Sequence, residues 1–381
     1  MSPDRDEEVK NGLIVVEISV GNGPISGMVA SSDGSRLVVT NYGGDSVSII
    51  DTDSGRVVET VSGVQEPFAI AAAGPKGPES LASDRVYVSS VSEAYDSIAV
   101  IDVSTSTVVA THPLALSVSD LVVSADGRYV CASRNGTGSA DIAVLDTTTG
   151  RVEVIDIAGP GTTTQCVRTS PDGGRLYVGT NGPSGGKLFV LSATSDDRSA
   201  GRARWRRKKP NRPSNPEWTV TGVVEIGLAV RDLAISPDGA KDAEVYVASC
   251  CPELGAVVDI VDTRTNKIAS TRKLSEISGN LTGCTLSRDG DRAYLVSDDG
   301  VTVLCTLTQD IIGTVAVNQP SCVVESPDGK RLYVADYSGA VIVVPVASSA
   351  PFAIEGAEHR SYASADWVVP ELLQYEPALA F

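Results

Sequence analysis

The sequence is poor in the residues that enzymes most often use for proton transfer and zinc binding. Its 381 residues include two histidines, His112 and His359. A Ser–His–Asp triad needs a histidine beside its nucleophile, and a tetrahedral zinc site needs histidines or cysteines at short spacing. His112 falls next to Pro113 on an expected outer strand, and His359 falls near the C-terminal end. No P-loop or GxGxxG motif stands between a strand and a helix. We therefore predict no catalytic triad, no bound metal and no cofactor.

The cysteines are odd in number and lack the CxxC spacing of redox and zinc motifs. Most of the seven lie in apolar, strand-like runs, which is typical of free, buried thiols in a reducing compartment. Cys250 and Cys251 are adjacent and precede Pro252. We interpret this pair as ordinary cysteines at the end of a strand, and a vicinal disulfide or a reactive thiol is the alternative.

Long apolar runs are also missing, and so is a basic N-terminal region. No apolar stretch approaches the ~20 residues of a membrane-spanning helix. The segment Met1–Lys10 is charged and acidic, without the basic and apolar regions of a secretory signal. Together with the cysteines, these absences predict a cytoplasmic protein with no membrane span.

Positive charge is scarce outside one stretch. The net charge is −17, from 31 Lys and Arg against 48 Asp and Glu, which argues against nucleic acid as the main partner. Residues 201–213, however, hold seven basic residues and no acid, so the rest of the chain carries −24 once those seven charges are set aside. Acidic residues and prolines flank the stretch, and we predict a disordered loop over residues 196–216.

This basic loop supports two interpretations. It is a solvated loop that contacts the acidic remainder of its own chain, or it binds an acidic partner, an anionic surface or a nucleic acid. The tryptophan among the basic residues favours contact with a partner. The predicted partner-binding residues are Arg202, Arg204, Trp205, Arg206, Arg207, Lys208 and Lys209.

Aromatic residues make up only 5% of the sequence, although hydrophobic residues make up 42%. Val, Ile, Leu and Ala must therefore fill the core, and the β-branched residues among them favour strands. Helical periodicity is absent from the repeated part of the chain. These features predict an all-β protein.

A pattern typified by Ser170–Asn181 returns about every 45 residues. Each unit predicts four strands: a short inner strand ending in Ser, then an Asp-Gly turn, a strand resembling Arg-Leu-Tyr-Val, a strand that usually ends in Asp, and an outer strand. In such turns Asp accepts backbone hydrogen bonds and Gly adopts a positive φ. We therefore interpret the recurring aspartates as framework rather than as a catalytic or calcium-binding set.

Seven such units occur; the second lacks the Asp-Gly turn, and the seventh lacks an outer strand. Leu13–Val20 resembles the missing strand, so we expect it to pair with Val341–Val346 and close a ring. The predicted fold is a seven-bladed β-propeller of four-stranded antiparallel blades. We expect one domain over residues 1–381, with the propeller at 13–346 and a C-terminal tail, 347–381, docked on the ring.

Three of the expected second strands are closely similar, namely Arg36–Asn41, Arg175–Asn181 and Arg331–Asp336. Ser-Pro-Asp-Gly turns occur at 170–173, 236–239 and 326–329. In these features the chain resembles the YVTN-type β-propeller repeat family over roughly residues 13–346. The resemblance implies the seven-bladed fold, and it implies a scaffold or binding module more often than an enzyme. Seven-bladed lactonases with related repeats also exist, and fold alone is a weak guide to chemistry.

Propellers bind ligands where loops of several blades converge at one mouth of the central channel. In this chain the loops after the second strands and the connections into the inner strands share one face. Arg231 and Asp232 are adjacent there, and we expect an ion pair between them; the alternative is an arginine that anchors an anionic group. The predicted ligand-binding residues are Asp120, Gln165, Arg231, Asp232, Tyr42, Tyr95, Arg134, Asn181 and Tyr337.

These observations predict a non-catalytic binding or scaffold protein that recognises a protein or peptide, and a small molecule at the channel mouth is compatible with them. Two alternatives stay open. One is a lactonase- or lyase-like enzyme with its site at the channel mouth. The other is a binder of anionic surfaces or nucleic acid that acts through residues 201–213.

Overall fold

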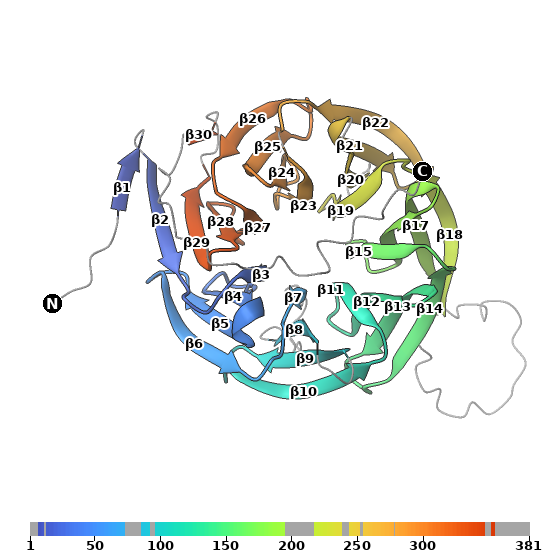
Figure 1. Ribbon diagram of the computed structural model, residues 1–381, viewed down its shortest axis with the longest axis horizontal. Helices are drawn as coiled ribbons and strands as arrows, with labels where there is room; N and C mark the ends of the chain where they lie inside the picture. Colours follow the sequence, from blue (N-terminus) through green and yellow to red (C-terminus); the bar gives the residue numbers. More distant parts are fainter. Residues whose placement is uncertain are drawn as a thin grey trace, which may run out of the picture.

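The structure, a computed structural model, describes residues 7–10, 13–72, 85–91, 96–194, 217–237, 244–251, 254–277, 279–346 and 352–354. Seven sheets stand in a ring around a central channel, and each forms one blade (Figure 1). The first strand of each blade faces the axis and the fourth strand lies at the rim. This arrangement confirms the predicted all-β, seven-bladed propeller.

The strands follow one another in chain order from axis to rim. Blade 1 holds β3 (Ile25–Ala30), β4 (Arg36–Asn41), β5 (Ser46–Asp51) and β6 (Arg56–Ser62), with a 3₁₀ turn, η1 (Tyr42–Gly44), after β4. Blade 2 holds β7 (Ile70–Ala72), β8 (Arg85–Ser90), β9 (Asp96–Asp102) and β10 (Thr107–Leu114). Blade 3 holds β11 (Ser117–Val123), β12 (Tyr129–Gly136), β13 (Ser139–Asp146) and β14 (Val152–Ala158). Blade 4 holds β15 (Thr163–Thr169), β16 (Arg175–Gly182), β17 (Gly185–Thr194) and β18 (Glu217–Glu225).

The last three blades follow the same order, and two of them gain strands from the chain ends. Blade 5 holds β19 (Ala229–Ile235), β20 (Glu244–Cys251), β21 (Gly255–Asp262) and β22 (Lys267–Leu274). Blade 6 holds β23 (Leu281–Leu286), β24 (Arg292–Ser297), β25 (Gly300–Cys305), β26 (Ile311–Val315) and β30 (Phe352–Ile354). Blade 7 holds β27 (Pro320–Glu325), β28 (Arg331–Asp336), β29 (Ala340–Pro345), β2 (Leu13–Ser19) and β1 (Glu7–Lys10).

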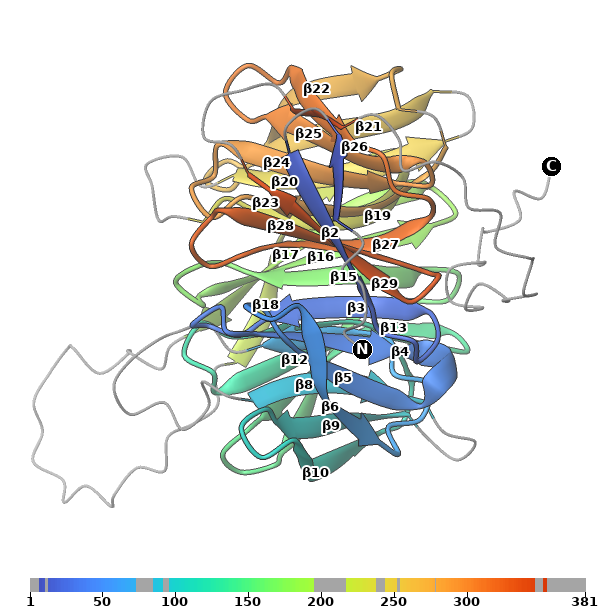
Figure 2. The ribbon, with the colours of Figure 1, turned by 90° about the vertical axis from the view of Figure 1, so that its left-hand side faces the viewer.

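The N-terminal strand β2 completes blade 7 and closes the ring, as predicted. It runs antiparallel to β29, with Val16 opposite Val343 and Ile18 opposite Val341. The strand ends at Ser19, one residue before the predicted end. In Figures 1 and 2, β2 crosses the outer side of the last blade, next to the first blade.

The Asp-Gly turns repeat one hydrogen-bond pattern. In blade 4, Ser170 Oγ donates to Asp172 Oδ1 at 2.5 Å, and the N–H of Gly174 donates to the same oxygen at 3.0 Å. Gly173 between them has a φ of +71°, which a residue with a side chain rarely adopts. The same Ser-to-Asp bond recurs at Ser31–Asp33, Ser124–Asp126, Ser287–Asp289 and Ser326–Asp328. These aspartates are framework, as predicted; the turn at 238–239 lies outside the described residues.

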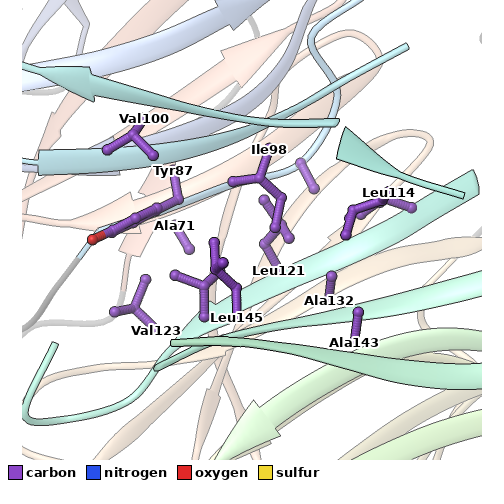
Figure 3. Packing of buried hydrophobic residues seen from close by; sticks show 13 residues of the cluster. Ala71, Tyr87, Ile98, Val100, Leu114, Leu121, Val123, Ala132, Ala143 and Leu145 are labelled. Carbon is purple, nitrogen blue, oxygen red and sulfur yellow. The ribbon is translucent and has the colours of Figure 1, made fainter. Parts of the chain in front are cut away.

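Buried apolar side chains gather in seven clusters within the described chain, one between each pair of neighbouring blades. Figure 3 shows the cluster in which Tyr87 and Ile98 of blade 2 pack against Leu121 and Leu145 of blade 3. Every blade is therefore covered on both faces. This double burial explains why the second and third strands read as continuous apolar runs rather than as alternating ones.

Two of the predicted segments lie largely outside the described residues. They are the basic loop, 196–216, and most of the tail, of which only Phe352–Ile354 is described. That short strand, β30, pairs in parallel with β26. In the described part of the chain, no helix has the length and apolar character needed to cross a membrane.

Ring closure gives a test with a matched control on one strand. Ile18 is 4% exposed and packs between blades 7 and 1, whereas Val16 on the same strand is 38% exposed. We expect Ile18→Ala to lower the free energy of unfolding by about 2–4 kcal/mol and Val16→Ala by less than about 1 kcal/mol. Urea denaturation measures both changes. Equal effects of the two substitutions would show that closure does not depend on this seam.

The hydrogen bonds of the turn aspartates allow a prediction of how the stability of the fold changes at acidic pH. Hydrogen bonds from Ser170 and from the N–H of Gly174 hold the pKa of Asp172 below its ordinary value. A lowered pKa contributes stability that is present above the ordinary value of about 3.9 and is lost as the pH falls through the native value. We expect Asp172→Asn to be less stable than the unchanged chain at pH 7, and the difference to narrow below about pH 4. Thermal unfolding of both chains between pH 7 and pH 3 measures this difference in stability. A difference that does not change with pH would contradict the stabilising role of the ionised Asp172.

Candidate binding site in the central channel

The inner strands of the blades enclose a channel cavity of about 920 Å³. Six of the seven inner strands carry a shift of register by one residue near their start. Such a β-bulge redirects the extra side chain, and here each extra residue lines the channel. These bulge residues are Ser26, Ser119, Gln165, Arg231, Thr282 and Ser321. They place a ring of polar groups toward the face that carries the loops after the second strands.

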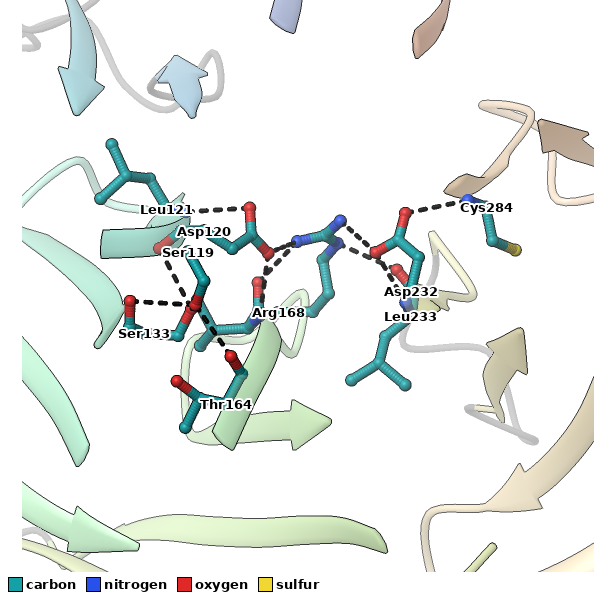
Figure 4. Close-up of polar contacts among 10 residues, drawn as sticks. Ser119, Asp120, Leu121, Ser133, Thr164, Arg168, Asp232, Leu233 and Cys284 are labelled. Carbon is teal, nitrogen blue, oxygen red and sulfur yellow. Dashed lines mark hydrogen bonds and ion pairs between the residues drawn. The ribbon is translucent and has the colours of Figure 1, made fainter. Parts of the chain in front are cut away.

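Below this ring, one arginine joins two carboxylates from the neighbouring blades. Arg168 of β15 lies between Asp120 of β11 and Asp232 of β19 (Figure 4). Its Nη1 donates to Asp120, its Nη2 donates to Asp232 Oδ1 at 2.6 Å, and its Nε donates to the carbonyl of Leu233 at 2.9 Å. The guanidinium therefore connects blades 3, 4 and 5.

Backbone N–H groups also donate hydrogen bonds to the two carboxylates. Asp120 accepts from the N–H of Val167 at 2.9 Å, and Asp232 accepts from the N–H of Cys284 at 2.8 Å. Each aspartate thus reaches the inner strand of the next blade. Together with the bonds from the following residues, Leu121 and Leu233, these contacts give all four carboxylate oxygens at least one hydrogen bond.

The cluster carries two negative charges against one positive charge. Burial raises the pKa of Asp232 to about 6; the charge of Arg168 opposes this shift and the nearby Asp120 adds to it. Burial lowers the pKa of Arg168, but the two carboxylates outweigh it, so the guanidinium pKa lies above its ordinary value. The Asp232 carboxyl group therefore takes up a proton at a higher pH than a solvated aspartate does.

Three cysteines, Cys166, Cys284 and Cys322, also line the channel. Burial raises the pKa of all three thiols, to about 12 for Cys322. Because the thiolate is the nucleophile, these side chains are poor candidates for covalent chemistry. Within the ranges that the structure describes, no group of three or more His, Cys, Asp or Glu side chains is arranged to hold a metal ion.

Polar and apolar groups are mixed around the channel. Blades 4 to 6 contribute Gln165, Arg168, Arg231, Asp232 and Thr282, together with partly exposed Ile235 and Leu286. Blades 2, 3 and 7 contribute the partly exposed apolar groups Phe68, Ile70, Val122 and Val324, with Tyr337 at the mouth. Ser26, Ser119, Asp120 and Ser321 lie on the same side as these apolar groups.

The structure brings five of the nine predicted ligand-binding residues to the channel: Asp120, Gln165, Arg231, Asp232 and Tyr337. Asp232 pairs with Arg168, an ion pair that the sequence did not predict, and the expected pair of Arg231 with Asp232 stays a prediction. Arg231 Nε donates to Cys250 Sγ at 3.1 Å.

Three other predicted residues do not line the cavity. Asn181 is buried, and its side-chain amide makes two hydrogen bonds to the backbone of Val230 in the next blade, at 2.8 and 2.9 Å. Arg134 is buried against Asp141, the residue opposite it in the β12–β13 hairpin. Tyr42 packs edge-on against the ring of Phe68 outside the cavity lining.

Tyr95 and the basic-loop residues Arg202–Lys209 lie outside the described residues. One central residue was not among the predicted ones, although the sequence contained a signal for it. At the position of Arg168, the other inner strands carry Val29, Ala71, Val122, Ala234, Thr285 or Val324. A charged residue that replaces small or apolar ones at one inner position marks an exception within the repeat.

Seven four-stranded blades around an open axis define the chain as a seven-bladed β-propeller. A protein of Mycobacterium tuberculosis, "Seven-bladed beta-propeller protein Rv1057", is 54% identical over 377 residues, which cover 97% of this chain and 94% of that protein. The chain therefore belongs to the family of this seven-bladed β-propeller protein. No protein-family model matches the sequence.

Among solved structures, a chain of hydrazine synthase from Kuenenia stuttgartiensis superposes with a TM-score of 0.66. The superposition covers 91% of this chain and 100% of that chain, at 21% sequence identity. At this identity the similarity shows the propeller fold alone.

The arginine of the cluster gives the next prediction. Arg168→Met leaves two carboxylates facing each other in a wall where their side chains are 15–20% exposed. We expect a loss of roughly 2–4 kcal/mol in unfolding free energy at pH 7, smaller at pH 5 because Asp232 then takes up a proton. Adding Asp120→Asn and Asp232→Asn should restore part of the loss.

Lys330→Met is the control for this experiment, because Lys330 pairs with Asp328 while 79% exposed, and such surface pairs contribute about 0–1 kcal/mol. Urea denaturation at the two pH values measures all variants. A loss for Arg168→Met no larger than that of the control contradicts the role assigned to the cluster.

Proposed function

We propose that this protein is a non-catalytic binding module that recognises a protein or peptide segment at the mouth of its central channel. The ring of bulge residues carries the proposal, because it gathers polar side chains from six blades around one opening. Few polar groups on a mainly apolar lining are what a specific binding pocket needs.

The mixture of polar and apolar groups around the channel favours a peptide as the ligand. An extended chain presents side chains alternately to opposite sides, so one set can contact Phe68, Ile70 and Val324 while the other faces Gln165 and Thr282. The hydroxyl groups of Ser26 and Ser119 are already bonded to carbonyls of the next blade, those of Pro67 and Thr164. The polar contacts to a ligand therefore fall on blades 4 to 7.

Two finer assignments belong to the same proposal. We assign the repeats to the YVTN type, on the strands that begin at Arg36, Arg175 and Arg331. We place the protein in a reducing, cytoplasmic compartment, which agrees with its seven free cysteines.

One observation favours an enzyme as the second candidate. A carboxyl group with a pKa near 6 in a channel wall suits general acid or base catalysis at neutral pH. Asp232 would act in a lactonase- or lyase-like reaction at the channel mouth. Turnover of a panel of lactones and esters that disappears in Asp232→Asn would establish this candidate in place of the first.

Binding of anionic surfaces or nucleic acid through residues 201–213 stays a prediction.

The binding function is tested with a displayed library of random peptides selected on the full chain. We expect Thr282→Arg and Ser321→Arg, which fill the mouth with a long side chain, to weaken the selected peptides at least tenfold in fluorescence anisotropy. Leu307→Arg is the control, because Leu307 is 90% exposed in the turn before β26, on the opposite face. If no peptide is selected, or if the control loses as much affinity as the mouth variants, the proposal fails.

A further inference from the structure

The short strand β30 determines the face at which the C-terminal part of the chain leaves the propeller. It runs parallel to β26, with Gly313 opposite Phe352 and Val315 opposite Ile354. β26 is the fourth strand of blade 6, and it runs toward the face from which the chain enters β27. Because the two strands are parallel, β30 ends on the face that carries the bulge residues, at the rim of blade 6.

The sequence after Ile354 has two parts of different character. Residues 355–366 are mostly small or charged, and Trp367–Phe381 is apolar, with Leu372, Leu373 and Tyr375 between its ends. This last stretch contains one of the three tryptophans and one of the four phenylalanines of the chain. In a protein with 5% aromatic residues, such a stretch has the composition of a binding segment.

The length of residues 355–366 is sufficient to bring this segment to the axis. β30 is the fifth strand of blade 6, so it lies about 20 Å from the inner strand at ~4.8 Å per strand. Twelve extended residues span about 40 Å. The linker therefore reaches the channel mouth with length to spare.

The channel offers a surface of matching chemistry. Phe68, Ile70, Val122, Val324 and Tyr337 are partly exposed and line one wall. Their exposed apolar area lies within a cavity of about 920 Å³ rather than on a flat surface. Large side chains such as those of Trp367, Tyr375 and Phe381 gain most from such a concave apolar wall.

We propose that Trp367–Phe381 docks into the channel mouth of its own chain, against this apolar wall, as an intramolecular ligand. The inference rests on the proposed function, since it names an occupant of the same site. A tethered segment meets its site at an effective concentration of about 1 mM. Partner segments must compete with it, so their apparent affinity equals the intrinsic affinity multiplied by the fraction of chains in which the site is open.

The test uses a fluorescently labelled peptide with the sequence Trp367–Phe381 and two full-length chains. One is unchanged, and the other carries Trp367→Ser, Leu372→Ser and Leu373→Ser. These three positions lie outside the described residues, so a thermal unfolding curve of the substituted chain is the control for its stability. We expect the substituted chain to bind the peptide at least tenfold more tightly than the unchanged chain, because its own segment no longer occupies the mouth.

Blocking variants locate the binding. Val122→Lys in the channel wall, added to the substituted chain, should abolish peptide binding. Val154→Lys is the matched control, because Val154 is 50% exposed on β14, the outer strand of the same blade. Thr282→Arg at the mouth is the second blocking variant, in case Val122→Lys destabilises blade 3. If both blocking variants bind the peptide as the control does, the site is not the channel and the inference is overturned.

Hydrogen exchange on the full chain gives an independent measurement. We expect the amides of residues 367–381 to exchange at least tenfold more slowly in the unchanged chain than in Thr282→Arg. Equal exchange rates, or equal peptide binding by the two chains, would overturn the inference. If library-selected peptides bind the mouth while the Trp367–Phe381 peptide does not, this inference fails and the proposed function stands. If neither kind of peptide binds, both fail.

Discussion

The structure depends on one seam, the pairing of β2 with β29. A blade covers its neighbours on both sides, so each of the seven apolar clusters exists only where two blades meet. Without β2, the cluster between blades 7 and 1 loses Ile18 and Val20. An open ring would then expose an apolar face and an unpaired strand edge. The N-terminal strand therefore sets the geometry of the channel as well as the stability of the ring, because the channel exists only in the closed ring.

The polar groups around the channel serve the same purpose as the apolar clusters. Asn181 reaches the next blade at Val230, and Asp120 and Asp232 reach the next blade through the N–H groups of Val167 and Cys284. At the inner strands, hydrogen bonds to a neighbouring backbone connect the blades in addition to apolar contacts such as those of Leu121 and Leu233. For this reason polar residues near a propeller axis are not evidence of a site by themselves, and their remaining hydrogen-bonding capacity must be examined.

The sequence predicted the elements that depend on nearby residues. The serine, aspartate and glycine of each turn bond within five residues of one another, so their pattern predicts blades and register. The sequence predicted the closing strand because β2 resembles the outer strands of the other repeats. The sequence could not show whether Asn181 and Arg134 contact a ligand or the rest of the chain. Their burial, which depends on the folded structure, decides this question. The prediction missed Arg168, whose partners lie 48 and 64 residues away in the chain, beyond the reach of any local pattern.

Closure by the N-terminal strand has a consequence for the other end of the chain. In a ring closed by its last strand, the C-terminus would form the rim of blade 7. Here β2 fills that place, so the chain after β29 leaves on the face of the Asp-Gly turns and is not needed for closure. Its next described strand, β30, crosses blade 6 in the opposite direction to β29 and returns the chain to the channel face. The pairing that completes the ring thus leaves the chain after β29 outside blade 7, and β30 runs back to the face that carries the channel mouth.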